Sequence, residues 1–71
     1  MAERLKYRLN DEELAAVEQA IRRDERARVR QRATAIRMLH LGKHPGEVAE
    51  GMAVSMMTVY NWHARFRAEG L

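Results

Sequence analysis

Apolar residues recur through the first half of the chain at the spacing of an α-helix. Asn10, followed three residues later by Glu13, has the form of a capping box and marks where the first helix should begin. The periodic positions expected in the core are Leu14, Val17, Ile21, Val29, Ala33, Ile36 and Leu39 or His40. The pattern predicts one helix over residues 10–23 and a second over residues 24–41, which Gly42 ends.

The second half of the chain has the pattern of two helices joined by a tight turn. Pro45 suits the first turn of a helix, where its missing N–H is not needed, and Ser55 can cap a second helix over residues 55–69. The expected inward positions are Val48, Ala49 and Met52, then Val59, Trp62 and Phe66. The spacing places Trp62 in the core rather than on a stacking surface. A short helix, a turn and a longer helix predict a helix-turn-helix at 44–70.

These elements predict an all-α fold, a small bundle of about four helices that occupies residues 10–71. Residues 1–9 stand apart as a basic N-terminal arm or short strand, because apolar and basic side chains alternate there. A chain of 71 residues buries only about 60% of its unfolded surface, so good packing or self-association is needed for stability. The first two helices are expected to complete the core that the helix-turn-helix cannot form alone.

Several segments resemble a known family more closely than a generic helix-turn-helix does. The segments are Arg32 to Gly42, Glu47 to Glu50, Met52 to Ser55, Thr58 to Trp62 and Arg65 to Leu71. They are similar to the N-terminal, homeodomain-like DNA-binding domain of mariner-related bacterial insertion-sequence transposases, and the similarity covers roughly residues 11–71. The resemblance implies a DNA-binding function, either in recognising transposon ends or in a stand-alone regulatory protein derived from such a domain.

The sequence departs from the family pattern at two places. The family has a glycine in the turn where this chain has Ala53, and a left-handed backbone costs a non-glycine residue about 1–2 kcal/mol. Either Ala53 accepts that conformation, or the turn is shifted so that Gly51 adopts it. The second departure is Met56-Met57, where the family often carries arginine or lysine at the start of the recognition helix.

The pattern of the N-terminal arm leaves four possibilities. Its alternation allows a frayed end, or a segment that lays Leu5, Tyr7 and Leu9 on the core, and we favour these two. It also allows a basic arm that reaches a DNA minor groove, as homeodomain arms do. The fourth possibility is a strand that pairs with a second copy of the chain, since a lone strand leaves its backbone groups unpaired.

Charge and composition narrow the classes of protein. The formal net charge is +3, and eleven of the 13 basic residues are arginine, which is suited to bidentate phosphate contact. The arginines of helix 24–41 are expected to form mainly a solvated face, with phosphate or partner contacts as the alternative. Cysteine is absent, so there is no disulfide or thiolate zinc site, and no apolar run approaches the roughly 20 residues of a membrane helix. We expect a cytoplasmic, nucleoid-associated protein.

The candidate DNA-contacting residues lie on and beside helix 55–69, which would enter the major groove. They are Lys43, His44, Ser55, Met56, Met57, Thr58, Tyr60, Asn61, Ala64, Arg65 and Arg67. Asn61 is the best candidate for base reading because its amide can pair bidentately with adenine. Ser55 and Thr58 could donate to phosphates, and the two methionines could pack on thymine methyl groups. Tyr60 could contact phosphate or stack, and the basic residues are expected to hold the DNA backbone.

Other functions are less well supported. His40 and His44 are four residues apart, but Gly42 and Pro45 interrupt the helix that would align them, so no metal or other cofactor is expected. The acidic residues have no nucleophile, base or phosphate-binding glycine loop beside them, so an enzyme is not expected. The catalytic carboxylates of the resembled transposases belong to a separate domain, and the residues do not decide whether this chain is complete or one domain of a longer protein. A homodimer or a longer multidomain chain is expected for specific binding to double-stranded DNA.

The main alternative is a helical domain that binds another protein. Met56, Met57 and Tyr60 would then form an exposed apolar contact patch in place of a DNA-reading surface. No membrane partner and no small-molecule substrate is expected in either case.

Overall fold

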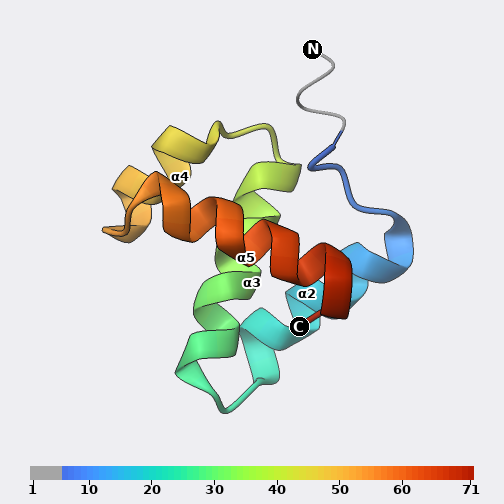
Figure 1. The fold of residues 1–71 in the computed structure, drawn as a ribbon. Helices are drawn as coiled ribbons and strands as arrows, with labels where there is room; N and C mark the ends of the chain where they lie inside the picture. The colour runs from blue at the N-terminus through green and yellow to red at the C-terminus, as the bar shows by residue number, and fades with distance from the viewer. Residues whose placement is uncertain (1–5) are drawn as a thin grey trace.

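Four helices follow one another along residues 6–71, the part of the chain that the computed structural model describes. They are α2 (Asp11–Arg23), α3 (Ala27–His40), α4 (Pro45–Met52) and α5 (Met56–Glu69). Figure 1 shows α5 crossing α3, with α4 beside the start of α5 and α2 beside its end. The all-α fold of about four helices is confirmed. None of the helices in residues 6–71 combines the length and hydrophobicity that crossing a membrane requires.

Helix α2 begins at the capping box that the sequence predicts. The side chain of Asn10 accepts a hydrogen bond from the Glu13 N–H at 2.7 Å, and the Glu13 carboxylate accepts one from the Asn10 N–H at 2.9 Å. This reciprocal pair satisfies two N–H groups that the start of a helix leaves without partners. Three acidic residues in the first turn and two arginines in the last complement the helix dipole.

Helix α3 begins later than the sequence predicts. We expected it to open at Asp24, but Asp24 ends α2 and the helix begins at Ala27. The cause is local: the Asp24 carboxylate accepts a hydrogen bond from the Arg26 N–H at 2.9 Å and pairs with the Arg26 guanidinium at 3.0 Å. These hydrogen bonds from Arg26 hold the pKa of Asp24 below its usual value. Arg30 closes the corner by donating to the carbonyl oxygens of Asp24 and Glu25.

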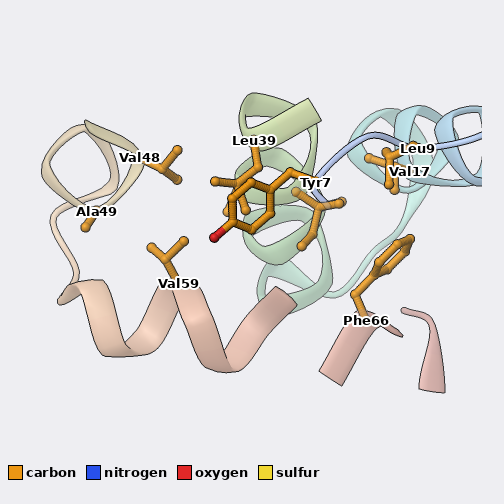
Figure 2. Close-up of a cluster of buried hydrophobic side chains, with 11 residues drawn as sticks. Tyr7, Leu9, Val17, Leu39, Val48, Ala49, Val59 and Phe66 are labelled. Carbon is orange, nitrogen blue, oxygen red and sulfur yellow. The ribbon is translucent and has the colours of Figure 1, made fainter. Parts of the chain in front are cut away.

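One hydrophobic core joins all four helices and the segment before them (Figure 2). Val17 of α2, Val48 of α4 and Val59 of α5 are each fully buried. The core positions expected for α3 are buried, with Leu39 rather than His40 at the last of them. Ala35 is also fully buried, although it lies off the stripe that the sequence predicted. Helix α3 therefore contacts the rest of the domain on more than one side.

The described part of the N-terminal arm, residues 6–9, packs on the helices as turn and coil rather than as a strand. Tyr7 and Leu9 are buried, and the Tyr7 ring meets the His63 ring edge-on at 4.7 Å between centroids. The Leu9 N–H donates to His40 Nδ1 at 3.0 Å. These residues thus follow the expectation of a segment laid on the core, and residues 1–5 lie outside the described residues.

Candidate nucleic-acid interface

The turn between α4 and α5 sets the angle between the two helices of the motif. Ala53 adopts the left-handed conformation, with φ 58° and ψ 42°, while Gly51 stays within α4. The Ala53 N–H donates to the Glu50 carbonyl and the Val54 N–H to the Ala49 carbonyl, which together form a Schellman motif. Of the two possibilities that the sequence left open, the structure selects the one in which Ala53 takes the conformation that usually requires glycine.

Helix α5 is capped by Ser55, as the sequence predicts, and its first residue is Met56. Ser55 Oγ accepts a hydrogen bond from the Thr58 N–H at 3.1 Å, and the Ser55 and Thr58 hydroxyls lie 2.9 Å apart as a second hydrogen-bonded pair. Each hydroxyl retains acceptor capacity and can rotate its proton. The two residues therefore cap the helix and lie where the positive end of the helix dipole points outward.

The solvent face of α5 carries the side chains that the sequence proposed for contact. Val59 and Phe66 are buried on the opposite face, and Trp62 is half-buried and packs against the core. The exposed apolar residues are Met56 at 46%, Met57 at 66% and Tyr60 at 41% of their full surface. Asn61 and Ala64 are exposed on the same face, and Thr58 is half-buried at its edge. The exposure of these side chains leaves this face open to a ligand.

The basic residues proposed to hold a DNA backbone differ in how firmly they are bonded to other residues of the domain. Lys43 and His44 are exposed before α4, where the His44 N–H donates to the Glu47 carboxylate at 2.9 Å. Arg65 pairs with Glu69 at 3.8 Å, and both side chains are largely exposed. Such an exposed pair contributes little and opens easily.

Arg67 is committed to contacts within the domain. Its guanidinium pairs with the Glu13 carboxylate at 3.0 Å and donates to the backbone carbonyls of Lys6 at 3.0 Å and Arg8 at 2.9 Å. The guanidinium thus joins the end of α5 to the N-terminal segment and to the start of α2. A phosphate would compete with three existing acceptors for this side chain, so Arg67 acts first as a structural residue.

The structure also separates the arginines of α3, which the sequence could not rank. Arg26 and Arg30 bond to the corner before α3, and Arg37 pairs with Glu18 of α2 at 3.2 Å. Arg28 and Arg32 have no hydrogen bond or ion pair with any residue in 6–71. No sequence signal singles out this pair, because Arg26 and Arg30 have the same i,i+4 spacing as Arg28 and Arg32.

The three histidines do not form a common site. Within residues 6–71, no group of three or more His, Cys, Asp or Glu side chains could hold a metal ion. His63 is half-buried beside Tyr7, and its Nε2 is buried without a hydrogen-bond partner among the described residues. Burial lowers the pKa of His63, the nearby charge of Arg67 lowers it further, and the Lys6 carbonyl partly opposes the shift. A neutral His63 is the form that fits this environment.

Comparison with known proteins connects this arrangement to one family. A family model of the homeodomain-like domain matches residues 26–71. That region takes in α3, α4 and α5, while α2 and the segment before it lie outside the match. Comparison with curated proteins and with solved structures gives no match.

Proposed function

Because the chain belongs to the homeodomain-like domain family, we propose that it is a DNA-binding helix-turn-helix module that lays α5 in the major groove. The observation that carries the proposal is the exposed face of α5, which is backed by Val59 and Phe66 and begins at the Ser55 cap. A reading helix needs such a division, since one face must hold the core while the other meets base edges.

The residues of this face have distinct roles in the proposal. Asn61 reads adenine through its amide, and Met57 packs on a thymine methyl group. Ser55 and Thr58 hold a phosphate at the start of α5, where the helix dipole favours an anion. Arg65 leaves its exposed pair with Glu69 to contact the DNA backbone.

The biological setting that we propose is the recognition of transposon ends, or regulation by a protein derived from such a domain. The resemblance of roughly residues 11–71 to the DNA-binding domain of mariner-related transposases supports this setting. A single small module binds DNA weakly, so a homodimer or a second DNA-binding domain would supply specificity. The domain acts by binding and performs no catalytic step.

The first test is titration of labelled random-sequence duplex DNA by fluorescence anisotropy at about 50 and 200 mM salt. A phosphate-binding surface gives non-specific binding near 10⁻⁴ to 10⁻⁶ M at physiological salt, and it tightens as salt is lowered. Selection of a preferred site from a random pool would follow. Absence of binding at the lower salt concentration contradicts the proposal.

Base reading is tested by Asn61→Ala on the selected site. The change should weaken binding there roughly 5- to 150-fold, because one bidentate base contact is worth about 1–3 kcal/mol, and should weaken random-DNA binding much less. Arg65→Ala should lower both. Gln19→Ala removes an exposed amide from α2 and serves as the matched control. Equal loss on all DNA sequences for Asn61→Ala would remove its base-reading role.

The second candidate function is binding of a partner protein through Met56, Met57 and Tyr60. It is favoured by the exposure of these three side chains on one face. Under this function Met57→Asp abolishes the activity of the protein, whereas Asn61→Ala and Arg65→Ala leave it nearly unchanged. The DNA titration separates the two candidates, because a protein-binding domain has no need of a salt-dependent affinity for random DNA.

A further inference from the structure

An arginine-lined hollow lies between the first half of α3 and the second half of α5. Its volume is about 570 Å³, and it is lined by Arg26, Ala27, Arg28, Val29, Arg32 and Arg65. Four of these six residues are arginines and none is acidic. We call this feature the arginine hollow.

The charge of the arginine hollow is unusual on this surface. The hollow between α2 and α3 is lined by Glu18 as well as Arg22 and Arg37, and the one beside the chain end by Asp24 as well as Arg23. In those two places acidic side chains offset the arginines. The arginine hollow has no acidic residue in its lining, and of its four arginines only Arg26 and Arg65 pair with acids beside it, Asp24 and Glu69. It therefore keeps an excess of positive charge where a solvated anion can reach it.

The arginines of the hollow are available to an external ligand to different degrees. Arg28 and Arg32 have no polar partner within residues 6–71, and Arg65 has only its exposed contact with Glu69. Arg26 is held by Asp24 and forms the fixed end of the wall. Three guanidinium groups can therefore bind an anion without breaking a buried interaction.

The backbone holds these arginines in place. Val29, which lies next to Arg28, is buried with only 3% of its surface exposed, and this fixes the rotation of α3. Arg28, Arg32 and Ala35 follow one another at i, i+4 and i+7 on the same stripe, and Ala35 is fully buried. The stripe thus runs from the packed core out to the arginine hollow, so the two arginines stand on a rigid element.

The hollow borders the proposed reading face of α5. Thr58, Asn61 and Arg65 recur at i, i+3 and i+7, so they form one stripe of the helix. Arg65 is the member of that stripe that enters the hollow. A helix in the major groove has a phosphate backbone along each of its sides, so Arg65, at the far end of this stripe from the Ser55 cap, would lie beside one of them while Asn61 reaches the bases.

We propose that the arginine hollow binds phosphates of the DNA strand that runs beside α5, and that Arg28 and Arg32 are DNA-contacting residues. The inference rests on the proposed function and extends the interface from α5 to α3. Guanidinium groups suit this role because they bind phosphate oxygens through paired hydrogen bonds and stay charged at every physiological pH. The interface would then hold one strand at two points, at Ser55 and Thr58 and again at the hollow.

The test compares the salt dependence of DNA binding for two double variants that lose the same charge. Arg28→Ala with Arg32→Ala removes two contacts from the hollow, and Arg22→Ala with Arg23→Ala removes two exposed arginines from α2, outside the family match. Each phosphate contact contributes about 0.9 to the slope of log K against log salt. Raising the salt from about 50 to 200 mM weakens binding by the unchanged chain, and it should weaken binding by the first variant by a factor that is roughly tenfold smaller. The second variant should keep the slope.

Arg28→Lys with Arg32→Lys guards against a folding defect, since it keeps the charge on the same stripe. It should retain the slope of the unchanged chain. If the unchanged chain binds DNA and both alanine variants keep its slope, the role of the arginine hollow is overturned while the proposed function stands. A loss of slope in the α2 variant as large as in the α3 variant also overturns it, because total charge would then be the cause. No DNA binding by the unchanged chain ends the proposed function and this inference together.

Discussion

Replacing Ala53 with glycine is expected to stabilise the domain. Ala53 is the one non-glycine residue in 6–71 with a positive φ, at 58°, and its position is fixed by the two hydrogen bonds that end α4. In the left-handed region Cβ approaches the following carbonyl oxygen, at a cost of about 1–2 kcal/mol. The folded chain bears this cost at the turn that orients α5.

The end of α3 shows the same motif with glycine in this position. Gly42 has φ 100°, its N–H donates to the Leu39 carbonyl, and the Lys43 N–H donates to the Met38 carbonyl. Ala53→Gly would make the two turns alike. Glycine also makes the unfolded chain more flexible, which lowers the unfolding free energy by about 0.4–1 kcal/mol and offsets part of the gain. The net gain in unfolding free energy should be about 0.5–1 kcal/mol, which raises the Tm of a domain of this size by roughly 2–8 °C.

Urea unfolding followed by far-UV circular dichroism measures this change, and the m-value should stay constant if only the folded turn is affected. Ala15→Gly is the matched control, because Ala15 is exposed in the middle of α2 with an ordinary helical backbone. There glycine should cost about 1 kcal/mol. The two substitutions are chemically identical and should have opposite signs. A loss of stability at position 53 similar to that at position 15 would refute a left-handed Ala53.

Two further predictions concern the contacts between α5 and the N-terminal segment. Arg67→Met should lower the unfolding free energy by about 1–2 kcal/mol, because Glu13 Oε2 and two backbone carbonyls lose the hydrogen bonds that Arg67 donates. Hydrogen exchange should show faster exchange at Leu9, whereas Arg65→Met, which loses only an exposed pair, should have little effect on either measurement. Stability should also fall as pH drops below 6.5, because the pKa of folded His63 is lowered and the unfolded chain binds the proton first. Urea midpoints across pH should depend less on pH in His63→Gln than in His44→Gln, which changes an exposed residue.

The parts of the fold that the sequence predicted correctly are those set by local interactions. The capping box at Asn10, the cap at Ser55 and the inward positions Val59 and Phe66 each depend on residues within about two helical turns. Periodicity and caps record such interactions directly. The predicted start of α3 was wrong for a related reason. Acidic residues before an apolar run are typical of a helix start, but the side chain of Asp24 bonded instead to the backbone two residues on.

The contacts that the sequence did not predict join residues far apart in the chain. Arg67 reaches Glu13, 54 positions away, and the carbonyl of Lys6, 61 positions away. Near the end of a recognition helix an arginine is a natural phosphate contact, and no periodic pattern distinguishes it from a structural one. The contact of Tyr7 with His63 is equally invisible to a local pattern. For the same reason the sequence offered the α3 arginines as one group, and only their partners in the folded chain divide it.

The position of α3 explains why the domain needs more than the three helices of the family match. Arg37 on one side of α3 bonds to Glu18 of α2, whereas Ala35 lies on the stripe that leads to α5. A helix buried from two sides needs a covering layer on each, and α4 with α5 can supply only one. Helix α2, with Val17 fully buried, supplies the other. The same two-sided packing holds the arginine stripe of α3 beside α5, so the segment outside the match supports the surface that we propose contacts DNA.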